Sequence, residues 1–166
     1  MKLEALFKTD GKKLIRISDS KEYEVKDCLK KEALECQGEA KAAGVAEPFF
    51  AINIPWTLVG LDEESYNEQF LSDLRDYLKV LDEKQIYVYI NPVVDCAADT
   101  LSRKEDLVAS FKHCARRIKD CTSVVGFAVP DGADEKYFIE EMNVKHSHYI
   151  YFVKKSVSGA ENVVLL

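Results

Sequence analysis

The segment Ile86-Tyr87-Val88-Tyr89-Ile90-Asn91-Pro92 has the composition of a buried β-strand. Its first five residues are β-branched or aromatic and do not alternate between apolar and polar side chains. Such a continuous run is typical of a parallel strand that helices cover on both faces. Proline has no backbone N–H to donate to a sheet, so Pro92 marks the end of the strand. These residues therefore predict one strand of a parallel sheet.

Three other segments end in a similar way and recur at a nearly constant interval. They are residues 14–18, 50–56 and 124–130. Pro55 lies 37 residues after Ser18 and 37 residues before Pro92, which lies 38 residues before Pro130. An interval of this size accommodates one strand, one helix and two short loops. The sequence therefore predicts successive βα units.

Amphipathic helices are expected between these strands, because apolar residues recur there at intervals of three or four. The expected helices cover about residues 25–43, 65–84, 102–118 and 134–143. Ser65 with Glu68, and Ser102 with Glu105, have the spacing of a capping box and predict the starts of the second and third helices.

The two ends of the chain add further elements. Residues 3–7 and 12–17 flank Thr9-Asp10-Gly11, which predicts a β-hairpin. Residues 149–153 predict a fifth strand, and residues 162–166 a short edge strand or a docking tail. We therefore expect a single α/β domain over residues 1–166, with about five βα units in a parallel sheet behind an N-terminal hairpin. The sheet forms half of a TIM-like barrel or, alternatively, a flavodoxin-like doubly wound sheet, and the strand order distinguishes the two.

Composition excludes several classes of function. The net charge is −6 and no run of lysine and arginine occurs, which argues against nucleic acid as a partner. No stretch approaches the roughly 20 apolar residues of a membrane span, and we expect a cytoplasmic protein. The five cysteines show no disulfide or zinc spacing, and no nucleotide-binding motif is present. We therefore expect neither a metal site nor a cofactor.

Candidate binding residues follow the strands, because ligands of parallel α/β folds bind at the carboxyl ends of the strands. The ligand-binding candidates are Asn53, Trp56, Asn91, Asp95 and Asp131. Asp95 and Asp131 form a carboxylate pair if their strands are neighbours, and Trp56 offers a ring to stack on a sugar. Each also has a purely structural interpretation: turn or cap residues for the acids, core packing for Trp56, and bonds within the sheet for the two asparagines.

Several of these segments resemble (β/α)8-barrel glycoside hydrolases of the cellulase-like clan. Ala40-Lys41-Ala42-Ala43-Gly44-Val45 followed by Phe50-Ala51-Ile52-Asn53-Ile54-Pro55-Trp56 resembles their first helix and second strand. Residues 61–85 and 86–92 resemble the following helix and the third strand, residues 124–131 the fourth strand, and residues 10–13 the hairpin that precedes the barrel. The resemblance implies a barrel-like fold with its site at the carboxyl ends of the strands.

The chain departs from this family at the residues that carry catalysis. The family's fourth strand ends in Asn-Glu, with the glutamate as general acid/base, whereas Val129-Pro130-Asp131 stands here. The family's nucleophile comes from a late strand that we expect this chain not to reach. We therefore expect no glycosidase activity, and a carbohydrate or small molecule bound at the strand ends. The alternatives are an interaction module, such as a homodimer that closes the barrel, and an enzyme that uses Asp95, Asp131 or Cys96 in other chemistry.

Overall fold

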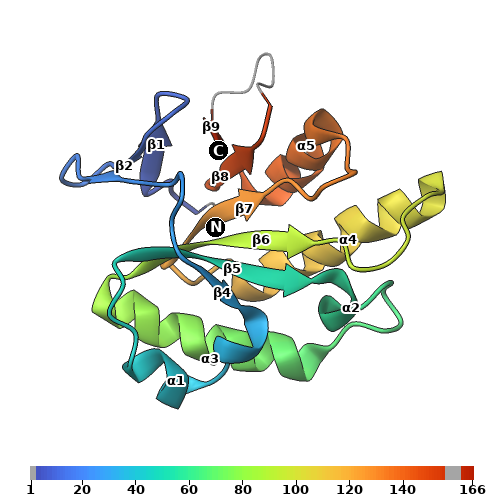
Figure 1. Ribbon diagram of the computed structural model, residues 1–166, viewed down its shortest axis with the longest axis horizontal. Helices are drawn as coiled ribbons and strands as arrows, with labels where there is room; N and C mark the ends of the chain where they lie inside the picture. Colours follow the sequence, from blue (N-terminus) through green and yellow to red (C-terminus); the bar gives the residue numbers. More distant parts are fainter. Residues whose placement is uncertain (1–2, 156–161) are drawn as a thin grey trace.

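The computed structural model describes residues 3–155 and 162–166, which form two sheets and a set of helices (Figure 1). The strands are β1 (Phe7–Thr9), β2 (Leu14–Arg16), β3 (Glu22–Tyr23), β4 (Lys30–Glu32), β5 (Phe49–Pro55), β6 (Tyr87–Val93), β7 (Val124–Ala128), β8 (Ile150–Val153) and β9 (Val163–Leu165). The helices are η1 (Ala33–Glu35, a 3-10 helix), α1 (Glu39–Ala43), α2 (Trp56–Val59), α3 (Glu68–Lys84), α4 (Leu101–Ile118) and α5 (Glu135–His146). None of the helices in this part of the chain has the length and apolar composition that crossing a membrane requires.

The larger sheet has the strand order of a barrel segment. Its strands lie in the order β4-β5-β6-β7-β8-β9, and every neighbouring pair is parallel. A doubly wound sheet would reverse direction at a switch point, with the second strand outside the first. The half-barrel prediction is therefore confirmed, and the flavodoxin-like alternative is wrong.

The two faces of the parallel sheet have different coverings. On the outer face Phe50, Ile52 and Val88 belong to one core together with Leu74 of α3 and Phe111 of α4. Ala51, Tyr89 and Phe152 belong to a second core, in which further residues of the parallel strands pack against the small antiparallel sheet and the segment after it, and to which no described helix contributes. The expectation of helices on both faces is thus wrong. A continuous apolar strand shows that both faces are covered, but it does not show by what.

The N-terminal sheet covers only one end of the inner face. Phe7 of β1 packs edge-on against Tyr87, and Tyr23 of β3 packs against Phe49, with ring centroids 5.0 and 5.9 Å apart. Tyr87 and Phe49 are the first residues of β6 and β5. The small sheet therefore closes the amino ends of the parallel strands, at the left of Figure 1, and leaves their carboxyl ends open.

The predicted hairpin is confirmed, but its second strand is not the first strand of the parallel sheet. β1 and β2 pair antiparallel around Asp10, whose carboxylate accepts from the N–H groups of Lys12 and Lys13. The segment 14–18 matched the interval of the later strands, yet β2 pairs with β1 and β3. The 37-residue interval before Pro55 is therefore coincidental, because the first parallel strand is β4.

The helix expected over residues 25–43 is also wrong. This region contains β4, η1 and the short α1, and Asp27 and Gly38 have φ angles of +61° and +78°, which a continuous helix does not allow. β4 reads Lys-Lys-Glu because it lies at the edge of the sheet, where its side chains reach solvent. A polar edge strand lacks the apolar signal by which the central strands are recognised.

The later elements agree closely with expectation, apart from the residues that cap them. α3 begins one turn after Ser65, with Asn67 as the cap that accepts from the Phe70 N–H, and α4 is capped by Thr100. β8 matches the predicted fifth strand, and β9 is the predicted edge strand, paired parallel to β8. Gly126 lies where β7 passes β8, and a side chain there would overlap the Ile150 carbonyl.

Candidate functional site

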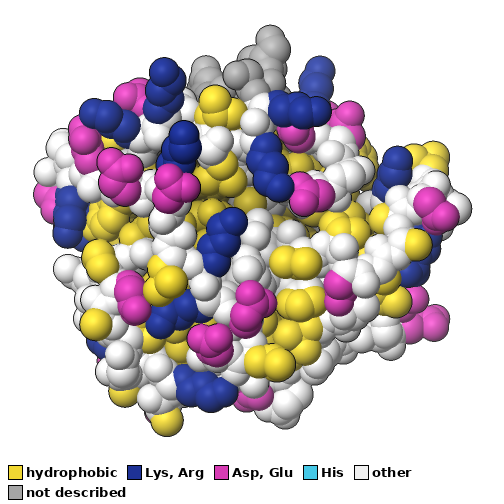
Figure 2. Space-filling view, viewed as in Figure 1, with side chains coloured by type: hydrophobic (Ala, Val, Ile, Leu, Met, Phe, Trp, Pro, Cys, Tyr) yellow, Lys and Arg dark blue, Asp and Glu magenta, His cyan; other side chains and the backbone are white. Residues whose placement is uncertain are grey.

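A cavity of about 170 Å³ lies on the concave inner face, toward the carboxyl ends of the strands. Lys30 of β4 and Phe152 of β8 both line it, although β5, β6 and β7 lie between these two strands in the sheet. The sheet therefore curves enough to bring distant strands to one cavity, as in a barrel. Figure 2 shows apolar side chains in the middle of this face, with charged side chains around them.

The chemistry of the cavity comes from five side chains on β4, on β6 and just after β7 and β8. They are Lys30, Tyr89, Asn91, Asp131 and Lys154, which lie around an apolar wall that includes Ala128, Phe152 and Leu166. Asn91 and Asp131 are two of the residues that the sequence predicted for a ligand site. Sequence analysis missed Lys30 and Lys154, because an exposed lysine carries no signal until the fold places it at a cavity.

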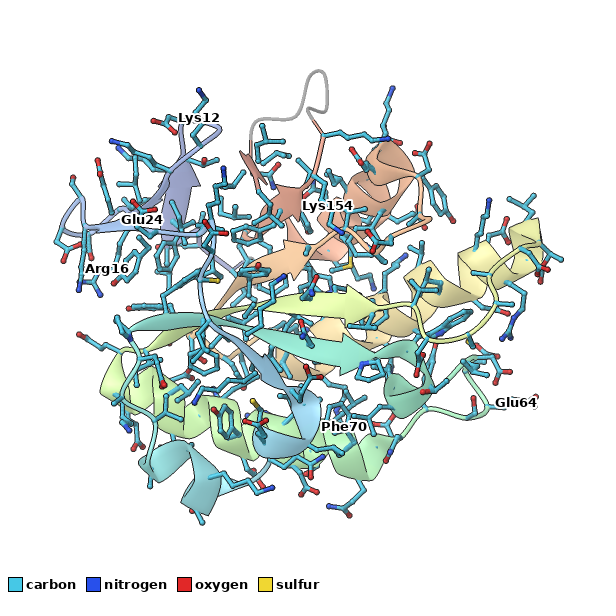
Figure 3. The ribbon with its side chains drawn as sticks, viewed as in Figure 1. Lys12, Arg16, Glu24, Glu64, Phe70 and Lys154 are labelled. Carbon is cyan, nitrogen blue, oxygen red and sulfur yellow. The ribbon has the colours of Figure 1, made fainter. Side chains whose placement is uncertain are left out.

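Lys154 and Asp131 form an ion pair at the mouth of the cavity. The Lys154 Nζ lies 2.8 Å from Asp131 Oδ1, and the two side chains are 67% and 78% exposed (Figure 3). Solvent screens a pair this exposed, so the pair contributes at most about 1 kcal/mol and separates easily. Lys30 has no carboxylate within 4.0 Å of its ammonium among the described residues. Both lysines are therefore available to a ligand.

Asn91 and Asn53 belong to a row of polar side chains across three strands. The Asn91 amide N–H donates to Asn53 Oδ1 at 2.8 Å, and Asn53 donates to Glu32 Oε1 at 3.0 Å. The three residues are register partners on β6, β5 and β4, so their side chains leave the sheet on the same face. Asn53 is held by its two neighbours, whereas Asn91 also faces the cavity. Glu32 was missed because it lies in a region expected to be helical.

Tyr89 contributes a hydroxyl group that stays protonated. Its side chain is 2% exposed and stacks on Phe152, with ring centroids 4.3 Å apart. Burial, together with the neighbouring Cys28 thiol, raises the pKa of Tyr89. The phenol therefore remains neutral beside the Cys28 thiol, and its buried side chain forms part of the cavity lining.

Trp56 lies in the outer core and not at the site. The side chain has no exposed surface, its indole N–H donates to Ser110 Oγ at 3.1 Å, and the Arg103 guanidinium lies 4.9 Å from the ring centre. A ring with no accessible face cannot stack on a sugar. The structural interpretation, core packing at a strand end, is the one that the geometry supports.

Asp95 has a structural role at the start of α2. Its carboxylate accepts from the Thr57 backbone N–H at 3.0 Å and from the Thr57 hydroxyl. It lines an open groove with Leu34 and Leu58, separate from the cavity at Asp131. The expected pairing of Asp95 with Asp131 is therefore absent among the described residues.

The described residues contain no cluster of three or more histidine, cysteine or acidic side chains that could hold a metal. His146 and His148 lie at the opposite end of β8 from the cavity, packed around Tyr149. Burial lowers the pKa of His146 to about 4, and it lowers the pKa of His148 as well. Both imidazoles therefore stay neutral near pH 7; His146 is buried, and His148 is half-buried.

Comparison with solved structures places the fold among glycoside hydrolases that form TIM barrels. An endogalactoceramidase aligns with a TM-score of 0.62 at 9% sequence identity, over 91% of this chain and 53% of that one. A GH5_18 protein from Bifidobacterium longum subsp. infantis aligns with a TM-score of 0.47 at 7% identity, over 63% of this chain and 34% of that one. No protein-family model and no curated protein sequence matches the chain.

The protein thus has a glycoside-hydrolase-like α/β fold. The described parallel strands follow one another in chain order across the sheet, and the chain spans about half the length of the endogalactoceramidase. At this level of identity the likeness defines the fold and not the reaction.

Proposed function

We propose that the concave cavity binds a small saccharide or a sugar-like molecule and does not hydrolyse it. The observation that carries the proposal is the convergence of Asn91 and two lysines beside an apolar wall whose half-buried members are Val94, Val129 and Leu166. Ligand sites combine an apolar wall with a few polar groups that fix orientation. Hydroxyl groups of a sugar match the Asn91 amide and the two ammonium groups, and the C–H face of a sugar ring matches the half-buried apolar side chains of the wall.

The carboxylates of the site argue against hydrolysis. Glycosidases use two carboxyl groups on opposite sides of the scissile bond, about 5–5.5 Å apart for retention and roughly 6.5–9.5 Å apart for inversion. Among the described residues Asp131 is the only one whose side chain brings a carboxylate to the cavity lining, and Lys154 pairs with it. Glu32 accepts from Asn53 outside that lining. A single ion-paired carboxylate does not supply both an acid and a nucleophile.

A titration followed by amide NMR tests this proposal. Neutral and acidic monosaccharides and disaccharides at up to about 10 mM should shift the signals of Tyr89, Asn91 and Phe152 and leave those of α3 unchanged. Asn91→Ala should weaken binding about tenfold, because it removes one hydrogen bond and the partner of Asn53. Asn143→Ala, which removes an asparagine on α5, serves as the matched control.

Two results would contradict the proposal. If no sugar of the panel shifts the cavity residues, the binding function is refuted. Release of product from aryl glycosides, lost on replacement of Asp131 by Asn, would refute the absence of hydrolysis.

A second function, self-association through β4, is favoured by the uneven protection of the two sheet edges. The edge at β9 is covered, since the Leu165 N–H donates to the Gly11 carbonyl of the hairpin turn at 2.9 Å. β4 has no outer neighbour among the described residues, and Leu29 and Leu34 beside it are 49% and 64% exposed. Unpaired edges of this kind pair with other chains. Light scattering at high protein concentration tests this second function, and it should show a dimer that the Leu34→Lys variant no longer forms. A monomeric original protein, with the same molecular mass as the variant, would refute self-association.

A further inference from the structure

We infer that the ligand of the concave cavity carries a negatively charged group, a carboxylate or a phosphate, on its sugar-like body. This inference rests on the proposed binding function and names the class of ligand. It follows from the charge of the cavity, from the freedom of its lysines and from its supply of hydrogen-bond donors.

The charge of the cavity is opposite in sign to that of the chain. The protein has a net charge of −6, whereas the charged side chains that line the cavity are Lys30, Lys154 and Asp131, which sum to +1. A local reversal of sign on an acidic protein attracts anions to that point and repels them elsewhere. A neutral ligand would gain nothing from this arrangement.

The two lysines approach the cavity from opposite sides of the concave face. Lys30 comes from β4 and Lys154 from the end of β8, and three strands separate β4 from β8. Lys30 has no ion-pair partner among the described residues, and the partner of Lys154 is an exposed carboxylate. An anionic group in the cavity can therefore replace Asp131 as the partner of Lys154 while it also attracts Lys30.

The neutral groups of the cavity favour the same class of ligand. The Asn91 amide gives one hydrogen to Asn53 and has a second that can point toward a ligand, in addition to the hydrogens of the ammonium groups. The lining contains no arginine, so planar bidentate recognition is absent and each lysine acts as a point charge. Point charges accept a carboxylate or a phosphate without a strict geometric requirement, so the chemistry that both share is the anionic group.

The test compares three ligands with the same type of sugar ring by calorimetry or NMR: glucose, glucuronate and glucose 6-phosphate. Glucuronate or the phosphate should bind at least tenfold more tightly than glucose at 50 mM salt, and this preference should shrink at 500 mM salt because the charges are exposed. The preferred anion identifies whether the site takes a carboxylate or a phosphate.

Charge-neutral variants assign the preference to the cavity. Lys30→Gln and Lys154→Gln should each reduce the ratio of the affinity for the acidic ligand to the affinity for glucose by about threefold to tenfold, and the double variant should make the two affinities equal. Asp131→Asn should strengthen binding of the acidic ligand, because it removes the competing carboxylate. Lys136→Gln, an equal change of charge on the exposed face of α5, is the control and should have no effect.

The outcomes separate this inference from the proposed function. Equal binding of all three ligands, unchanged in the lysine variants, would overturn the inference and leave saccharide binding intact. If none of the three ligands binds and no sugar of the NMR panel shifts the cavity signals, both the inference and the proposed binding function are overturned. Circular dichroism of each variant confirms that the fold is retained.

Discussion

Asn91 donates its side-chain amide to the side-chain oxygen of Asn53 over 2.8 Å, at equivalent positions of two neighbouring parallel strands. Because Asn53 uses its oxygen for this bond, its own amide is directed at Glu32 on the next strand. The row therefore has one direction, from donor amide to acceptor carboxylate, and it fixes the side chain of Asn91 beside the cavity.

Replacement of Asn53 by Asp removes the hydrogen bond between position 53 and Glu32. The new carboxylate still accepts from Asn91 but faces Glu32 without a hydrogen between them, so we expect a loss of about 1 kcal/mol in the free energy of unfolding at pH 7. Urea denaturation measures this value. The double variant Asn53→Asp with Glu32→Gln supplies a donor again and should recover most of the loss. If the single variant is as stable as the original protein, the row has no energetic role.

Ser110 joins the outer core through two buried hydrogen bonds. Its hydroxyl accepts from the Trp56 indole at 3.1 Å and donates to the Gly60 carbonyl at 2.8 Å. Ser110→Ala leaves both partners unsatisfied in a buried place and should lower the free energy of unfolding by about 1–3 kcal/mol. The fluorescence of Trp56, the single tryptophan, follows unfolding directly. The exposed Ser102 on the same helix is the control, since Ser102→Ala should change stability by less than about 0.5 kcal/mol.

Stability should depend on pH through the buried His146. Burial, reinforced by His148 and nearby lysines, lowers the pKa of His146 to about 4 from an ordinary value of 6.5. Between these pH values His146 is protonated in the unfolded chain but not in the folded protein. The free energy of unfolding therefore decreases as the pH falls from about 6.5 to 4, by at most about 1.4 kcal/mol per pH unit for this one proton. Above pH 6.5 this contribution is complete and constant.

His146→Phe tests the origin of that dependence. The substituted ring keeps the stack on Tyr149 but cannot be protonated, so the fall in stability between pH 6.5 and 4.5 should become clearly smaller. Urea denaturation at several pH values gives the slope for both proteins. An unchanged slope in the variant would assign the dependence to other groups.

Gly126 and Gly44 make a matched pair of glycine substitutions. A methyl group at position 126 would overlap the Ile150 carbonyl oxygen, so Gly126→Ala should force β7 from β8 and cost about 3 kcal/mol or more. Gly44 has an ordinary φ of −87° and open space around it, so Gly44→Ala should stabilise the protein by about 0.4–1 kcal/mol. Thermal melts of both variants measure the difference. Similar melting temperatures would mean that β7 and β8 are farther apart than described.

Central strands and long helices could be predicted because their residues carry the signal themselves. The short apolar runs at 50–56 and 86–92 are typical of strands that are covered on both faces. The apolar residues of α3 recur with the period of a helix. β4 could not be predicted in this way. Its Lys-Lys-Glu sequence is compatible with helix or loop, and only pairing with β5 makes it a strand.

The site divides in the same manner. Asn53, Asn91 and Asp131 could be placed at one end of the sheet from sequence, because parallel strands present their carboxyl ends on the same side. Whether a side chain at that end faces the cavity depends on curvature and on the direction in which each residue leaves the sheet. For this reason Trp56 lies in the outer core and Asp95 binds the start of α2. Lys30 and Lys154 line the cavity for the same reason, although no local sequence pattern marks them.

The sequence by itself determined the parallel βα architecture, because apolar runs and the prolines at strand ends are local features that can be recognised within a single segment of the chain. The tertiary structure alone decided which strand lies at the edge, that a hairpin sheet covers the amino half of the inner face, and which charges meet at the cavity. Contacts between residues far apart in the chain set these features, and they depend on the curvature of the assembled sheet and not on any single segment.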